Sequence, residues 1–231
     1  MASLDKWYDV ELTYTSNAIE GGTLTRSETA IVIEKGITIG GKPLVDHIEA
    51  VDHHHALEVA REIARQGRPV TEADVLRLHE LVLHRSKPGV AGCYAQAPRR
   101  IAGSGVIFPS PMKIPILMAD FGQTLETREG WIGAAEAHFG LVSIHPFADG
   151  NGRIARLMMN LLLLRDGYPP ISIGPEQRAD YLAVLERRQL AEPLGHGVTD
   201  RPAHEAYLDF MGVRLIASLG DHLAFLGQAQ D

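Results

Sequence analysis

The chain has 231 residues, which suits one large domain or one domain with an appendage. A hydrophobic content of 45% and a charged content of 22% are typical of a globular protein and argue against wholesale disorder or collagen-like structure. The 22 basic and 29 acidic side chains give a net charge of −7, so a polyphosphate backbone would repel the chain and general nucleic-acid binding is not expected.

Cysteine content and apolar runs predict a cytoplasmic protein without a membrane partner. Cys93 is the single cysteine, so an internal disulfide is excluded. The first twelve residues carry four charged side chains, which argues against a signal-peptide core. The longest apolar run, residues 157–164, is far shorter than the roughly 20 residues that span a bilayer.

Glycine and proline punctuate the sequence at intervals that suit helices, which predicts an all-α fold. Thr25 and Glu28 match the capping box of a helix that Gly36 would end. Thr71 and Asp74 predict a second capped helix start. In chain order, helices are expected over residues 4–19, 25–35 and 46–66, from 71, over 114–127, from 131 to about 144, over 151–165, and from 175 and 200.

Residues 86–111 lose the helical periodicity because glycine and proline interrupt them. Within this segment, apolar residues flank Gly103 and Gly105, which predicts a short β-hairpin. The apolar residues of that hairpin are Ile101, Val106, Ile107 and Phe108.

The segment from His145 to Arg156 lies between two predicted helices and carries the candidate chemistry. Pro146 disfavours helical angles at His145, so the imidazole can leave the helix end and face a cleft. Gly150 and Gly152 permit positive φ, which lets backbone N–H groups converge on an anion at the start of the next helix.

The polar residues of this segment suit a nucleotide phosphate chain. Arg153 and Arg156 are three residues apart on the first helical turns and are expected to grip neighbouring phosphates. Asp149 offers hard oxygen for Mg²⁺, and Asn151 can donate to a phosphate oxygen. A neutral His145 can accept a proton from an incoming hydroxyl.

The same segment resembles the Fic signature His-x-Phe-x-(Asp/Glu)-Gly-Asn-Gly-Arg-x-x-Arg and matches every specified position. The resemblance implies a helical enzyme that transfers AMP from ATP to a Ser, Thr or Tyr hydroxyl of a target protein. It also implies roles for seven positions. His145 would be the general base, Asp149 the magnesium ligand, Gly150, Asn151 and Gly152 the α-phosphate site, and Arg153 and Arg156 the holders of the outer phosphates.

A second resemblance lies near the N-terminus. The run from Ser16 to Gly21 is similar to the inhibitory motif (Ser/Thr)-x-x-x-Glu-(Gly/Asn) of Fic proteins whose inhibitory helix precedes the core. The resemblance implies that Glu20 pairs with Arg156 and keeps the γ-phosphate away. Glu20 also falls at the negative end of a helix dipole, where a carboxylate needs a nearby cation.

Two further regions resemble the family more loosely. Residues 101–111 fall where Fic proteins keep a flap that docks the target segment by strand addition. Arg178 and Tyr181 resemble the adenine side of the nucleotide site, although Leu182 stands where a second aromatic residue is common.

The other histidines are interpreted as structural. Three consecutive side chains on a helix point in three directions, so His53, His54 and His55 are expected at the surface and not around a metal ion. His79 and His138 lack ligand spacing and are expected to be structural residues.

These observations predict an inhibitory segment at residues 1–45 and a catalytic core at residues 46–231, with ATP and Mg²⁺ as substrate and cofactor. Two alternatives stay open. The same site could remove AMP from a modified protein, with Glu20 orienting water, or the protein could be a non-catalytic ATP sensor. The target protein, and whether the chain forms a homodimer, are open as well.

Overall fold

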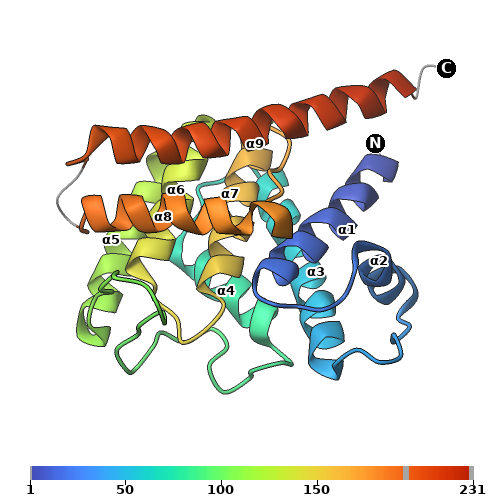
Figure 1. The fold of residues 1–231 in the computed structure, drawn as a ribbon, viewed down its shortest axis with the longest axis horizontal. Coiled ribbons are helices and arrows are strands. Elements are labelled where there is room, and N and C mark those ends of the chain that lie inside the picture. The colour runs from blue at the N-terminus through green and yellow to red at the C-terminus, as the bar shows by residue number, and fades with distance from the viewer. Residues whose placement is uncertain (1, 195–197, 229–231) are drawn as a thin grey trace.

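The computed structural model describes residues 2–194 and 198–228, and these form nine α-helices with two short 3₁₀ turns (Figure 1). The predicted all-α class is confirmed. The helices are α1 Ala2–Ile19, α2 Arg26–Lys35, α3 Leu44–Arg65, α4 Glu72–Leu83, α5 Ile114–Thr127, α6 Gly130–Ile144, α7 Asn151–Arg165, α8 Arg178–Ala191 and α9 Arg201–Gln228.

Three predicted helix ends are confirmed, and local residues fix each of them. The Thr25 hydroxyl accepts the N–H of Glu28 at 3.2 Å, and the Glu28 carboxylate accepts the N–H of Thr25 at 2.7 Å. Thr71 and Asp74 form the same reciprocal pair at the start of α4. Gly36 ends α2 at φ 65°, a left-handed conformation that glycine adopts without strain.

Helix α7 lies at the centre of the main core, as its apolar sequence predicts. It packs against α3, α4 and α6, and most of its side chains are buried. Helices α8 and α9 pack on one another and run along one side of the molecule, while α1, α2 and α3 cluster at one end (Figure 1). The N-terminus of α7 therefore faces the region between α1 and α8. None of the helices in the described residues could cross a membrane.

Helix α1 is part of the main core. Leu4, Leu12 and Ile19 are buried in the same cluster as the side chains of α7. The Tyr8 hydroxyl is hydrogen-bonded to the hydroxyl of Ser218 on α9, with 3.1 Å between the oxygens. This packing fixes the end of α1 beside the start of α7.

The predicted β-hairpin of residues 101–108 is not found. The described residues contain one isolated antiparallel bridge, between Tyr94 and Phe147, and no strand. Backbone N–H groups that would pair across a ladder are bound by side chains instead. The N–H of Gly105 donates to Glu186 at 3.1 Å, and that of Val106 donates to the Ser104 hydroxyl at 3.2 Å. A hairpin without a third strand has little stability of its own, so these local bonds prevail.

The expected surface position of His53 is wrong. His53 is buried beside Leu12, Ser16 and Arg156, whereas His55 is exposed. Helix α3 packs between α1 and α7, so the face that carries His53 is covered by both. Burial lowers the pKa of His53 to about 3, which keeps its imidazole neutral.

A buried arginine joins α8 to α6. The guanidinium of Arg188 donates to both carboxylate oxygens of Glu136 at 2.8 Å and to Glu192 at 2.8 Å. It also lies 3.8 Å from the ring centroid of Phe139. The residue is 2% exposed, so each of these interactions is protected from water.

Arg188→Ala should lower the free energy of unfolding by about 3 kcal/mol or more, because it leaves two acidic side chains without their cation. Urea unfolding measures this loss. Arg201→Ala is the matched control, since Arg201 makes the same i, i+4 pair with Glu205 at 2.8 Å but its side chain is 84% exposed. Equal effects of the two substitutions would contradict a structural role for the buried pair.

Candidate active site

His145 ends α6 in a left-handed conformation, with φ 51° and ψ 54°. Its N–H still donates to the carbonyl of Leu141 at 2.9 Å, so the helix stops and the ring turns out of it. The imidazole stacks on Phe108 with ring centroids 4.0 Å apart. Burial is the main reason that the pKa of His145 is lowered to about 4, so the ring is neutral at pH 7 and can accept a proton.

The loop after His145 is held by its own polar groups. The Asn151 amide accepts the N–H of Phe147 and donates to the carbonyl of Phe147, both at 2.9 Å. This side chain is therefore bound within the loop by one donor and by its oxygen. Gly150 adopts φ 77°, as predicted, and directs the chain into the first turn of α7.

Gly152 does not adopt the predicted positive φ, but it leaves room for the Glu20–Arg156 pair. It lies inside α7 with ordinary helical geometry and is not among the positive-φ glycines. A Cβ at this position would stand 2.5 Å from Oε1 of Glu20 and 3.0 Å from Nη1 of Arg156. The absent side chain therefore lets the end of α1 approach the first turn of α7.

Arg156 is buried and contacts the two residues of the N-terminal motif. Its Nη2 donates to Oε1 of Glu20 at 2.8 Å and to the carbonyl of Ser16 at 2.9 Å. Its Nε donates to the Ser16 hydroxyl at 3.1 Å. The pairing of Glu20 with Arg156 that the resemblance implies is thus present in the structure.

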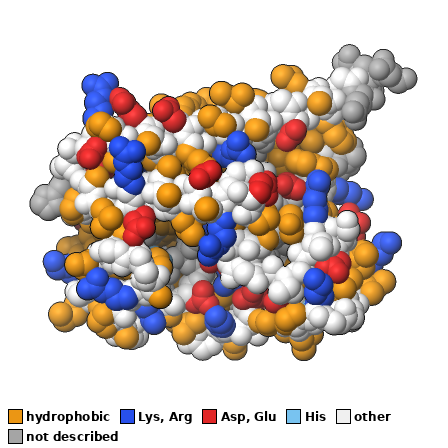
Figure 2. All heavy atoms as spheres, viewed as in Figure 1, with side chains coloured by type: hydrophobic (Ala, Val, Ile, Leu, Met, Phe, Trp, Pro, Cys, Tyr) orange, Lys and Arg blue, Asp and Glu red, His pale blue; other side chains and the backbone are white. Residues whose placement is uncertain are grey.

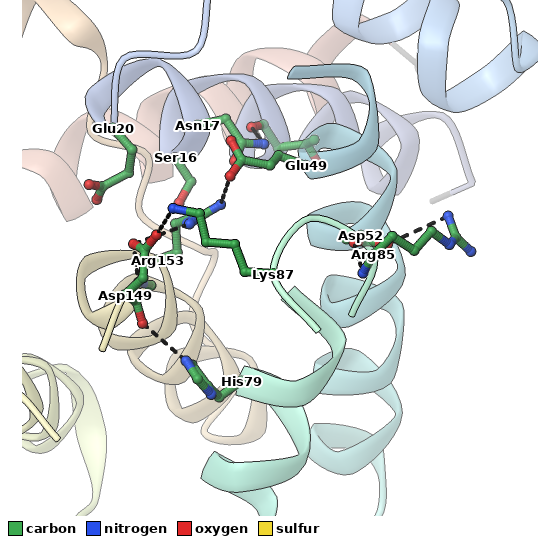
Figure 3. Close-up of polar contacts among 12 residues, drawn as sticks. Ser16, Asn17, Glu20, Glu49, Asp52, His79, Arg85, Lys87, Asp149 and Arg153 are labelled. Carbon is green, nitrogen blue, oxygen red and sulfur yellow. Dashed lines mark hydrogen bonds and ion pairs between the residues drawn. The ribbon is translucent and has the colours of Figure 1, made fainter. Parts of the chain in front are cut away.

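Arg153 has partners different from those of Arg156, and only Arg156 lines the cavity described below. The Arg153 guanidinium is 3% exposed and lies between Glu49 of α3, at 3.0 Å, and Asp149, at 3.5 Å (Figure 3). The partner Glu49 carried no signal in the sequence, because it is about a hundred residues from Arg153 and belongs to an unrelated helix.

Asp149 is paired with Lys87 from the segment after α4 (Figure 3). Although burial acts in the opposite direction, Lys87 and Arg153 hold the pKa of Asp149 below its usual range. The described residues contain no group of three acidic, histidine or cysteine side chains that could enclose a metal ion. One hard carboxylate nevertheless fits Mg²⁺, which commonly takes its other ligands from substrate phosphates and water.

His79 positions this loop, a role that its isolated place in the sequence did not reveal. Its ring stacks on Phe147 with centroids 3.7 Å apart and planes 8° apart. Nε2 is 3.0 Å from the carbonyl of Asp149, and Nδ1 accepts the N–H of Gly92 at 3.0 Å. The histidine therefore binds both the loop and the segment that follows α4.

Some of these residues border a cavity of about 320 Å³. His145, Gly152 and Arg156 line it on the side of α6 and α7, and Glu20 closes it on the side of α1. A hollow opens below α8 on the face shown in Figure 2, where acidic and basic side chains are interspersed. The remaining lining comes from residues 101–104 and 108 and from α8.

The other predicted site residues line either this cavity or a groove next to it. Ile101 and Phe108 line the cavity, whereas Val106 and Ile107 line an adjacent groove of about 590 Å³. Tyr181 borders the cavity but is only 1% exposed, so its ring face is not available to stack on a nucleobase. Leu182, which is exposed, is the apolar side chain that α8 presents there.

In a histidine NMR titration, His145 should stay neutral down to about pH 4, with His145→Ala assigning its signal. Phe108→Ala exposes the ring and should raise this pKa towards 6.5. Because the unfolded chain takes up the proton near pH 6.5, acidification from pH 6.5 to 4 should also destabilise the fold. A parent His145 that titrates near pH 6.5 would contradict the buried geometry.

Comparison with known proteins agrees with this fold. The sequence model of the Fic/DOC family matches residues 69–163. The protein adenylyltransferase Fic of Nematostella vectensis is 36% identical over 180 residues, which cover 75% of this chain and 42% of that protein. Its counterpart in Drosophila melanogaster is 35% identical over 178 residues, which cover 75% and 36%. The chain thus spans less than half the length of these relatives.

Solved structures resemble nearly the whole chain. A Fic domain containing signalling protein from Bacteroides thetaiotaomicron superposes with a TM-score of 0.85 at 30% identity, over 94% of this chain and 85% of that one. Fic-1 from C. elegans gives a TM-score of 0.81 at 28% identity, over 96% and 64%. The chain belongs to the Fic/DOC family.

Proposed function

We propose that this protein transfers AMP from ATP to a hydroxyl side chain of a target protein. The observation that carries the proposal is the single cavity onto which a neutral His145, the N-terminal turn of α7 and the Arg156 guanidinium all open. The relatives that are named protein adenylyltransferases support the same activity.

The arrangement suggests the following division of labour. Backbone N–H groups at the start of α7 would hold the α-phosphate, where the helix dipole is positive. His145 would accept the proton of the target hydroxyl as its oxygen attacks the α-phosphorus, and pyrophosphate would leave. Arg156 would hold the terminal phosphate and so position the pyrophosphate, which gathers negative charge as it leaves.

Asp149 would hold a magnesium ion, which neutralises phosphate charge when bound. Lys87 would have to move from this carboxylate, and its half-exposed side chain leaves it room to do so. Arg153 is paired with Glu49 and would reach a phosphate only by exchanging that partner, so its contribution to ATP binding is conditional on a rotamer change.

We extend the proposal to regulation by residues 1–45, with residues 46–231 as the catalytic core. Glu20 and Ser16 occupy Arg156 from the α1 side, where the γ-phosphate would otherwise bind. A carboxylate beside the phosphate site also repels the nucleotide. Transfer should therefore be slow until Glu20 leaves.

Residues 101–108 are proposed to dock the target as a flap. Ile107 is 73% exposed and lines the groove next to the cavity, so an extended segment could pack on it with its hydroxyl near His145.

Glu20→Gly should raise AMP transfer strongly, because it frees Arg156 for the γ-phosphate. The assay incubates the protein with magnesium and ATP labelled at the α-phosphorus and measures label on protein. Glu20→Gln, which keeps the size and removes the charge, should give intermediate activity. His145→Ala in the Glu20→Gly protein should abolish transfer and retain ATP.

The same assay separates the alternatives. Label from the γ-position would indicate phosphorylation, and no label from either position would favour the ATP sensor. Loss of AMP from a pre-labelled protein in the parent but not in Glu20→Gly would favour the hydrolase. Equal transfer by the parent and Glu20→Gly would remove the inhibitory role of Glu20.

Lys87→Met should lower the magnesium concentration that gives half-maximal transfer in the Glu20→Gly protein, since Lys87 competes with the ion for Asp149. Lys35→Met is the matched control, because Lys35 is exposed on α2, away from the cavity. An unchanged magnesium dependence in Lys87→Met would show that the lysine does not compete.

A further inference from the structure

A buried chain of polar side chains runs from Arg156 into the opposite side of the core. The side chains of Arg156 and of Tyr181 on α8 line the same cavity and lie next to one another. Although burial opposes it, Glu20 and then Tyr181 raise the pKa of Arg156. Nε2 of His138 on α6 is 2.8 Å from the Tyr181 hydroxyl, and Nδ1 is 2.9 Å from the hydroxyl of Tyr207 on α9. The Tyr207 hydroxyl donates to the carbonyl of Ala135 at 2.7 Å.

The direction of each hydrogen bond in this chain is determined by its two ends. The Tyr207 hydroxyl donates its one hydrogen to the carbonyl of Ala135, so it must accept a hydrogen bond from the Nδ1–H group of His138. Burial lowers the pKa of His138 to about 3, so the ring is neutral and its Nε2 carries no hydrogen. Nε2 therefore accepts the hydrogen of Tyr181.

The Arg156 end of the chain imposes the same direction on the hydrogen bonds. A guanidinium has no acceptor, so the Tyr181 oxygen must turn its lone pairs towards Arg156. It can do so because its own hydrogen is bound by His138. Tyr181, His138 and Tyr207 are all fully buried, so water cannot replace any member.

We propose that His138 and Tyr207 are positioning residues for the nucleotide reaction: they orient the Tyr181 hydroxyl as an acceptor that holds Arg156 where the terminal phosphate of ATP binds. This inference rests on the proposed function. It also replaces the predicted contact of Tyr181 with the nucleobase by a contact with the arginine.

Removing the Tyr207 hydroxyl should change the hydrogen bonding of Arg156 at the other end of the chain. In Tyr207→Phe, Nδ1 of His138 loses its acceptor, which favours the tautomer with the hydrogen on Nε2. That hydrogen would donate to Tyr181, whose own hydrogen would then face the Arg156 guanidinium. The arginine loses its acceptor and meets a donor, although it is separated from the substitution by two side chains.

The test measures binding in the Glu20→Gly protein by calorimetry with two probes, AMP and an ATP analogue whose α,β-bridge is methylene and cannot be cleaved. Tyr207→Phe should weaken the analogue about tenfold, as expected for a hydrogen bond to a charged group. AMP affinity should stay unchanged, because AMP has no terminal phosphate. AMP binding also shows that the site is folded.

Two variants of His138 make the test independent of Tyr207. His138→Leu keeps the bulk and removes both nitrogens, so it should lose the preference for the analogue over AMP. His138→Gln can donate with its amide nitrogen and accept with its oxygen, so it should restore much of that preference. Equal behaviour of the Leu and Gln variants would overturn the proposal.

A double-mutant cycle tests whether the effect passes through Tyr181. Tyr207→Phe should have no further effect in a Tyr181→Phe protein, and additive losses would overturn the relay. Tyr8→Phe is the matched control, because it also removes a buried tyrosine hydroxyl bound to α9 but lies outside the chain.

Failure of the proposed function would look different. A Glu20→Gly protein that binds neither the analogue nor AMP overturns both the function and this inference. A protein that binds both probes, with unchanged preference in Tyr207→Phe and His138→Leu, overturns the inference alone.

Discussion

The buried guanidinium of Arg156 is the interaction on which the arrangement of the site depends. A charge removed from water must be compensated on every side, and two helices supply the groups that do so. Helix α1 provides Ser16 and Glu20, and helix α8 provides Tyr181. The docking of α1 against α7, which also closes the cavity, therefore depends on the need to compensate the buried charge of Arg156.

The other charges of the site are compensated in the same way. Arg153 is balanced by Glu49, and Asp149 by Lys87. Each of these pairs uses a group that the proposed reaction would need for phosphate or metal. Under the proposed function, binding of ATP and magnesium would therefore require these charged groups to exchange partners.

Helix α7 explains why such a site can be assembled on a small chain. Its apolar sides are packed against α3, α4 and α6, so its first turn is held rigidly at the cavity. Loop residues between His145 and Gly150 then need little support of their own. Asn151 and His79 provide it through bonds to the loop backbone.

Much of the fold could be predicted from sequence because its signals are local. Capping boxes at Thr25 and Thr71 and the turn at Gly36 act within a few residues, so they fixed the helix ends. The hairpin was predicted wrongly since turn residues show where a chain bends but not whether its flanks pair. Burial of His53 was missed because neighbouring helices decide it.

For the site, the sequence by itself determined which residues form the loop between α6 and α7, that His145 leaves its helix, and that Glu20 falls at a helix end in need of a cation. Only the tertiary structure decided that Arg153 turns to Glu49, that Lys87 meets Asp149, and that a row of buried hydroxyls and an imidazole lies behind Arg156. The reason is physical. Backbone geometry depends on adjacent residues, whereas the partner of a buried charge is chosen by packing between helices far apart in the chain.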